Sequence, residues 1–122
     1  MASILIIAST PSLWNGLRKR FVNARMATYV ASTMERAAEV YADLEDPVVV
    51  LDVDGGQLDG LSALQSLKRF STRPKVLALC DHSARAKMLR AAGATAVLTK
   101  TGEEAADGER TLEAIRAMLA DR

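Results

Sequence analysis

The 122 residues, 49% of them hydrophobic, are enough for one core and predict a single domain over residues 1–122. A formal net charge of +1 excludes a general electrostatic footprint for nucleic acid or for an anionic membrane, and one Cys with one His excludes an internal disulfide and a structural zinc site. The apolar part of the opening segment is too short for a secretory signal or a membrane span, so we expect a soluble, cytoplasmic protein.

The first half of the chain alternates short runs of Ile and Val with segments of helical period. A strand is predicted over 4–8, buried on both faces because it does not alternate with polar residues. A helix starting near Ser12 follows, with Trp14 packing at its start, and then a second strand over 27–31. Thr33 is the predicted N-cap of the next helix. This order is typical of a parallel sheet wrapped by helices.

The middle of the chain repeats the pattern. A third strand is predicted over 48–52, and Asp59 is a plausible N-cap for a helix that ends before Pro74. The fourth strand is predicted over 75–80. These segments add two further strand–helix units to the first two.

The last third completes the sheet. A helix over 83–92 is stopped by Gly93, and a fifth strand is predicted over 96–99. The polar stretch 101–108 is expected to be mobile, and a last helix over 109–121 to follow it. Five such units in one domain predict an α/β fold with a doubly wound parallel sheet.

Ligands of doubly wound sheets bind at the carboxyl ends of the strands, near the topological switch point. That rule predicts that the residues just after the strands meet at one edge of the sheet. They are Ala8, Ser9, Asp52, Asp54, Cys80, Asp81 and Lys100.

Two stretches of sequence carry a family resemblance. VVVLDVDGGQLDGLSAL combines an apolar strand ending in Asp52 with Asp59-Gly60 seven residues later, and AAGATAVLTK combines Gly93-Ala94 with a strand ending before Lys100. The combination resembles a response-regulator receiver domain of two-component signalling, over nearly the whole chain. The resemblance implies a flavodoxin-like, five-stranded sheet of order 2-1-3-4-5 and a single receiver-like domain.

The resemblance also implies a chemistry. Asp52 would be the phosphoacceptor that takes a phosphoryl group from a phosphohistidine of a sensor kinase, and Lys100 would neutralise charge on the phosphoryl oxygens. Mg²⁺ would be held by Asp52, by the backbone carbonyl of Asp54 and by acidic residues at the end of the first strand. A plainer interpretation of Lys100 is an ion pair with Asp52 in a site that never meets phosphate.

The metal site departs from the family pattern. Ala8 and Ser9 stand where the family has its acidic pair, so Mg²⁺ binding is expected to be weakened. Mg²⁺ often binds through only one or two carboxylates, with water completing its shell. The remaining metal candidates are therefore Asp52, Asp54, whose side chain can turn into the pocket or stay in solvent, and Ser9, which can hold a metal-bound water.

The residues that read phosphorylation also depart from the pattern. Cys80 stands where the family has a phosphoryl-binding Ser or Thr, and a thiol is only a weak donor. Val97 stands at the switch position, where the family has an aromatic residue, and Thr101 where it commonly has a proline. Cys80 is otherwise expected to be a small buried hydrophobic residue.

Three interpretations follow. The first is a pseudo-receiver that regulates a protein partner through the fourth helix, fifth strand and fifth helix, with little or no Mg²⁺-dependent phosphorylation. The second is a working receiver phosphorylated on Asp52 by a sensor histidine kinase. The third is a small phosphate-ligand or flavin binder, suggested only by the hydroxyl-rich run 9–12. The first two predict no enzyme activity, a signalling protein as partner and, by resemblance, homodimerisation, without direct binding of nucleic acid or membrane.

Overall fold

The computed structural model describes residues 2–8, 11–52, 60–71 and 73–120; for residues 11–13 and 15–17 it describes the backbone alone. Five parallel strands form one sheet in the order β2-β1-β3-β4-β5, as predicted. The strands are β1 (Ala2–Ala8), β2 (Met26–Ala31), β3 (Val48–Asp52), β4 (Lys75–Cys80) and β5 (Ala96–Thr99).

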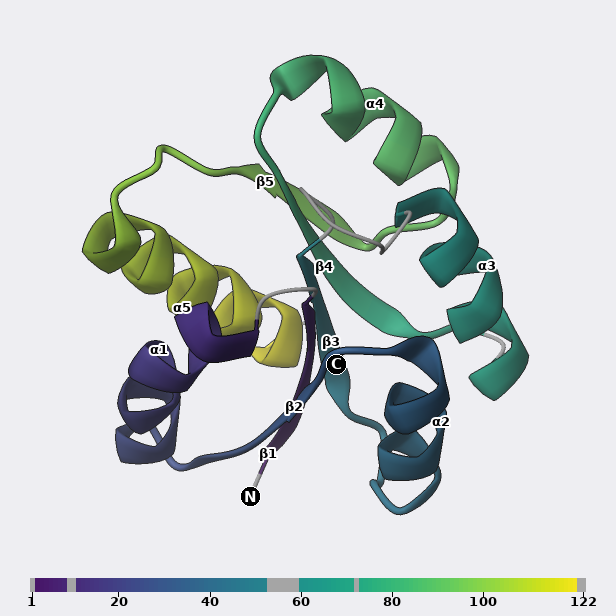
Figure 1. Cartoon of the computed structure of the whole chain (residues 1–122), viewed down its shortest axis with the longest axis horizontal. Coiled ribbons are helices and arrows are strands. Elements are labelled where there is room, and N and C mark those ends of the chain that lie inside the picture. Colours follow the sequence, from purple (N-terminus) through teal and green to yellow (C-terminus); the bar gives the residue numbers. More distant parts are fainter. Residues whose placement is uncertain (1, 9–10, 53–59, 72, 121–122) are drawn as a thin grey trace.

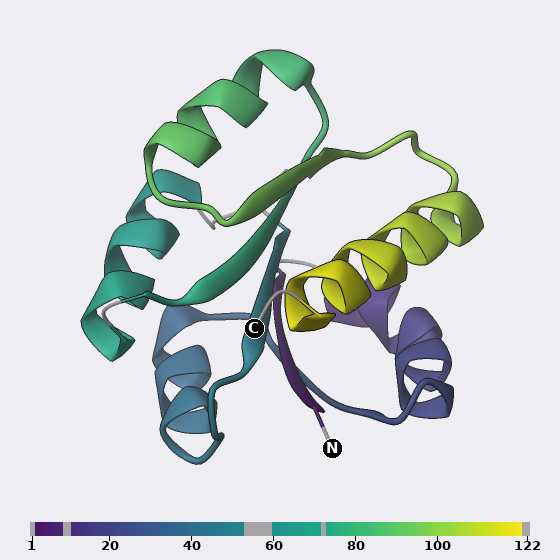
Figure 2. The ribbon, with the colours of Figure 1, turned by 180° about the vertical axis from the view of Figure 1, so that it is seen from behind.

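Helices cover both faces of the sheet. In Figures 1 and 2, α1 (Pro11–Asn23) and α5 (Glu104–Ala120) lie side by side on one face. The other face carries α2 (Met34–Ala42), α3 (Gly60–Phe70) and α4 (Ser83–Ala91). The order β1-β3 in the middle of the sheet places the topological switch between two central strands, as the doubly wound prediction requires.

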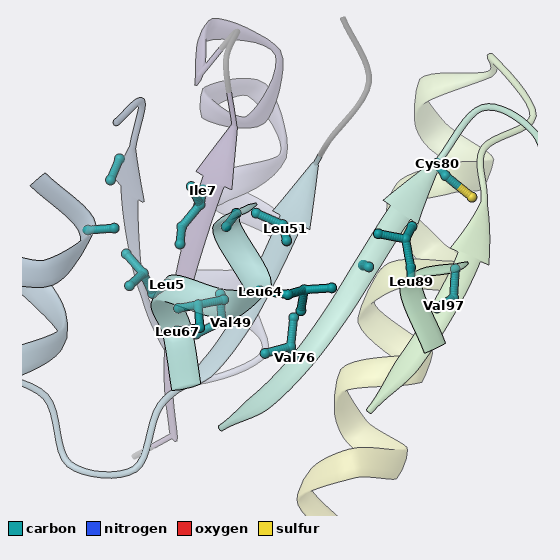
Figure 3. Close-up of a cluster of buried hydrophobic side chains, with 14 residues drawn as sticks. Leu5, Ile7, Val49, Leu51, Leu64, Leu67, Val76, Cys80, Leu89 and Val97 are labelled. Carbon is teal, nitrogen blue, oxygen red and sulfur yellow. The ribbon is translucent and has the colours of Figure 1, made fainter. Parts of the chain in front are cut away.

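The sheet separates two hydrophobic clusters because successive side chains of a strand point to opposite faces. In β3, Val48 and Val50 join the cluster under α1 and α5, while Val49 and Leu51 join the cluster under α2, α3 and α4. Figure 3 shows the second cluster, with side chains of α3 and α4 packed on those of the strands. All five residues of β3 are buried, which explains why an uninterrupted apolar run predicts this strand.

Local signals set several helix ends. The Thr33 side chain accepts a hydrogen bond from the Arg36 amide at 3.1 Å and caps α2, as predicted. Gly93 follows the end of α4 with a φ of +114°, a conformation that L-residues rarely adopt, so it stops this helix as predicted. The predicted N-cap Asp59 lies outside the described residues.

The predicted start of the last helix is wrong, because α5 begins at Glu104 rather than at 109. The expected mobile stretch is largely helical. Its first residues are held by the Asp107 carboxylate, which accepts hydrogen bonds from the Thr101 amide and hydroxyl and from the Gly102 amide. This side chain, rather than the apolar pattern, fixes where the helix starts.

Within the described ranges, the structure has no helix that is long and apolar enough to cross a membrane.

Candidate functional site

A cavity of about 240 Å³ opens at the carboxyl ends of the strands, where the sequence predicts a site. It brings together residues that are up to 93 positions apart in the chain, from Trp14 to Asp107. The described residues that line it are Trp14, Asp52, Asp81, Lys100, Gly102, Glu104 and Asp107. Four are carboxylates and one is an amine, so the described lining is acidic.

Asp52 is the last residue of β3 and is only 7% exposed. Its carboxylate oxygens have different partners. Oδ1 accepts a hydrogen bond from Lys100 Nζ at 2.8 Å, and Oδ2 accepts one from the indole Nε1 of Trp14 at 3.1 Å. A buried carboxylate needs such partners, because an isolated charge away from water is costly. Both oxygens of the candidate phosphoacceptor are thus bonded within the protein.

Lys100 directly follows β5, and its amide donates to the Cys80 carbonyl at 2.7 Å. This backbone hydrogen bond holds the main chain of Lys100 beside the end of β4. Lys100 Nζ lies 2.8 Å from Asp52 and 3.6 Å from Asp81. The predicted pairing of Lys100 with Asp52 is present, and Asp81 adds a second negative charge beside the amine.

Trp14 is held firmly on α1. It is 4% exposed, and its ring stacks on Phe21 with a centroid distance of 6.5 Å and an interplanar angle of 21°. Further along the helix, Arg20 pairs with Glu109 of α5 at 2.7 Å and donates to the Ala105 carbonyl at 3.3 Å. The indole therefore reaches Asp52 from a helix that is itself tied to α5.

Asp107 organises the rim of the cavity between β5 and α5. Burial raises the pKa of this carboxyl, but hydrogen bonds from Thr101 and Gly102 and the charge of Arg110 outweigh burial, so its pKa is lowered. Arg110 also donates to the Thr99 carbonyl at 2.8 Å, at the end of β5. Asp107 and Arg110 together hold the segment that carries Lys100.

The other predicted residues are not among those that line the cavity, or they lie outside the described residues. The Cys80 side chain belongs to the cluster under α2, α3 and α4, and its sulfur lies 3.3 Å from the His82 carbonyl (Figure 3). Val97, the predicted switch position, is 8% exposed and belongs to the same cluster. Ser9 and Asp54 lie outside the described residues.

The end of β1 offers no carboxylate. Ala8 is the register partner of Asp52 and is 1% exposed, so a methyl group lies buried beside the acceptor. Within the part of the chain that the structure describes, no group of three or more His, Cys, Asp or Glu side chains could hold a metal ion.

The sequence did not reveal the bond between Trp14 and Asp52 or the role of Asp107. Trp14 is predicted to pack at the start of its helix, near enough to the first loop to report on the site by fluorescence, but 38 residues separate it from its partner. Asp107 lay in a stretch that was expected to be mobile. The nearness of Trp14 to the first strand end was the only available signal.

Neither a protein-family model nor a curated protein sequence matches the chain. Solved structures do. A two-component response regulator from Clostridium difficile matches with a TM-score of 0.81 and 15% identity, over 99% of this chain and 98% of that one. A LuxR-family response regulator from Aurantimonas sp. SI85-9A1 matches with a TM-score of 0.79 and 26% identity, over 100% of this chain and 87% of that one.

The chain has the response-regulator receiver fold. A third similar structure is the response regulator TrrA from Thermotoga maritima in complex with Mg²⁺ and BeF, with a TM-score of 0.73 and 18% identity, over 93% of this chain and 98% of that one. In the receiver fold of the present chain, Asp52 and Lys100 meet at the carboxyl ends of the strands, where the resemblance predicted them.

Proposed function

We propose that the chain is a pseudo-receiver: a signalling module of a two-component pathway that regulates a protein partner, with little or no Mg²⁺-dependent phosphorylation of Asp52. The observation that carries this proposal is the set of neighbours of the Asp52 carboxylate. Its charge is met by Lys100 at 2.8 Å and by the Trp14 indole at 3.1 Å, and buried Ala8 lies beside it in the sheet. Lys100 and Trp14 thus supply hydrogen-bond donors to both carboxylate oxygens of Asp52 from within the protein.

Charge supports the same conclusion. A phosphoryl donor brings negative charge, and the described lining of the cavity carries four carboxylates against the single amine of Lys100. Catalysis of phosphoryl transfer is mainly positioning and neutralisation of such charge by cations. Among the described lining residues the amine is that of Lys100, which is already engaged by Asp52 and Asp81.

The partner-binding face is proposed to comprise α4, β5 and α5. On α4, the Met88 side chain is 55% exposed and stands among the exposed basic residues Arg85, Lys87 and Arg90. An exposed large apolar residue within a charged surface suits a protein contact. We propose a signalling protein there, a sensor kinase being one candidate, with no enzyme activity of the chain itself, in the cytoplasm. Homodimerisation stays a prediction.

One experiment tests the proposed function. The protein is incubated with acetyl phosphate and Mg²⁺, and separately with beryllofluoride and Mg²⁺. Intact mass reports phosphorylation, and the fluorescence of Trp14, the single tryptophan, reports any change at the site. We expect little stable modification and little spectral change. Stoichiometric modification that disappears in Asp52→Ala would contradict the pseudo-receiver.

The second candidate is a working receiver phosphorylated on Asp52 by a sensor histidine kinase. It is favoured by the direct contact of Lys100 with Asp52 and by the Mg²⁺ and BeF complex of the similar Thermotoga maritima protein. Under this alternative Mg²⁺ would bind despite Ala8, and the same incubation would yield the modified protein. A purified protein without bound flavin would dispose of the ligand-binding alternative.

A further inference from the structure

We propose that the Trp14 indole is an internal cap on Asp52, and that its N–H bond to the carboxylate, more than the missing acidic pair, keeps a latent phosphoacceptor inactive. This inference rests on the proposed pseudo-receiver and names the residue that enforces it. Nothing in the resemblance assigns a role to Trp14.

Both carboxylate oxygens of Asp52, the candidate phosphoacceptor, already accept hydrogen bonds. Transfer from a donor such as acetyl phosphate forms a bond from a carboxylate oxygen of Asp52 to phosphorus, breaks the bond from phosphorus to the acetyl oxygen, and releases acetate. The attacking oxygen must approach phosphorus to about 3–3.5 Å. Oδ1 is engaged by the Lys100 amine, and Oδ2 is engaged by the Trp14 N–H. The indole therefore occupies the oxygen that the amine leaves available.

The hydrogen bond between Trp14 and Asp52 is buried. Asp52 is 7% exposed and Trp14 4% exposed, so the bond between them is shielded from water. Hydrogen bonds to charged groups are stronger than neutral ones, and low local dielectric strengthens them further. A phosphoryl donor that enters the cavity must displace this N–H from Oδ2, which adds to the barrier for transfer.

The indole ring is held in place by its neighbours in the core. It stacks on buried Phe21, and Arg20 on the same helix is bonded to Glu109 and to the Ala105 carbonyl of α5. To leave Asp52, Trp14 must break its packing against Phe21 or move with α1. The cap is thus built into the core beneath α1 and α5, unlike a surface side chain that changes rotamer freely.

The lysine bond does not create the same block. Lys100 carries the positive charge that phosphoryl transfer uses, so its contact with Asp52 is compatible with either function. The indole N–H carries no net charge and offers the transferring group much weaker stabilisation. Removing the amine should therefore lower any phosphorylation, whereas removing the indole N–H should raise it. These opposite signs separate the two partners of Asp52.

The test measures the rate of Asp52 phosphorylation by acetyl phosphate and Mg²⁺, read by intact mass, in wild type and in Trp14→Phe. The phenyl ring keeps most of the packing and lacks the N–H. We expect a rate increase of about tenfold or more, corresponding to loss of one hydrogen bond to a charged acceptor. The double variant Trp14→Phe with Asp52→Ala should show no modification, which places the new phosphate on Asp52.

Two controls separate the N–H bond from looser packing and from the missing acids. Ile115→Val loosens the same buried cluster while keeping the Phe21 ring and the indole N–H, and it should leave the rate near that of wild type. The double variant Ala8→Asp with Ser9→Asp supplies carboxylates at the end of β1 and shows how far metal ligands alone restore transfer. An increase in Ile115→Val equal to that in Trp14→Phe would overturn the cap.

The outcomes distinguish the two proposals. Stoichiometric modification of wild type on Asp52 overturns the pseudo-receiver and, with it, the cap. If wild type and folded Trp14→Phe both resist while the variant with added aspartates is modified, the pseudo-receiver stands and the cap is wrong. Should Trp14→Phe fail to fold, benzothienylalanine at the single tryptophan keeps the ring shape without the N–H, and an unchanged rate there overturns the cap equally.

Discussion

Asp107 shows how one side chain determines the rim of the site. Its carboxylate accepts bonds from Thr101 and Gly102, and its backbone carbonyl accepts the Thr111 hydroxyl at 2.7 Å. Lys100 begins the segment that joins β5 to α5. These hydrogen bonds therefore hold that segment against the first turns of α5. Lys100 can hold one position beside Asp52 because the residues that follow it are fixed.

Replacing Asp107 by Asn should lower stability by about 1–2 kcal/mol at neutral pH, because bonds to a charged acceptor become bonds to a neutral one. The pKa of Asp107 is lowered from its ordinary value of 3.8, so its ionised form stabilises the fold above that pH. This contribution is lost as the pH falls through the lowered pKa of the folded state. Urea denaturation of both proteins across pH should show a constant gap above about pH 5 that closes on acidification. A gap that widens in acid would contradict this assignment.

At the site, the sequence predicts the residues that follow strands but not their partners. Asp52 and Lys100 could be placed because each ends an apolar run, and the carboxyl ends of parallel strands converge. Trp14 carries no such signal, since a tryptophan early in a helix most commonly packs in a core. Its bond to Asp52 depends on how α1 sits on the sheet, which only tertiary structure determines.

Among the elements, the last three strands and the starts of α2 and α4 were predictable, but the start of α5 was not. β3, β4 and β5 begin and end where the sequence indicates, because their apolar runs are bounded by proline or by polar residues. The start of α5 was missed because 101–108 carries polar residues and two glycines, a composition typical of a loop. Hydrogen bonds to Asp107 from Thr101 and Gly102, five or six residues earlier, override that composition, so local propensity misplaces the boundary.

Two glycines with positive φ lie next to helix ends, one after α4 and one before α5. Gly93, after α4, has a φ of +114°, and a Cβ there would lie 2.8 Å from Cε of Lys68; Gly102, before α5, has a φ of +93° and open space. The Lys68 side chain is flexible and can move aside, so backbone strain should dominate at both sites. We expect Gly93→Ala and Gly102→Ala each to cost about 1–2 kcal/mol, measured by urea denaturation. A much larger cost at Gly93 would show that Lys68 cannot yield.

At the scale of the whole molecule, one sheet joins two cores. The fully buried Leu67 of α3 belongs to the cluster under α2, α3 and α4, and the fully buried Ile115 of α5 to the cluster under α1 and α5. Alternate side chains of the same strands fill both clusters. Neither helical layer can lose its packing without exposing one face of the sheet, so the two layers should unfold together.

This coupling gives a whole-molecule prediction. Leu67→Ala and Ile115→Ala should each destabilise the protein by about 2–5 kcal/mol, because each leaves a cavity in a packed core. The sheet keeps the two sites from sharing side-chain contacts, so the variants should combine within about 0.5 kcal/mol of additivity. In either single variant, the fluorescence of Trp14, which reports the α1 and α5 layer, should follow the same urea transition as far-UV circular dichroism. If Leu67→Ala instead separates the two transitions, the layers are independent folding units, and the sheet does not transmit loss of packing from one face to the other.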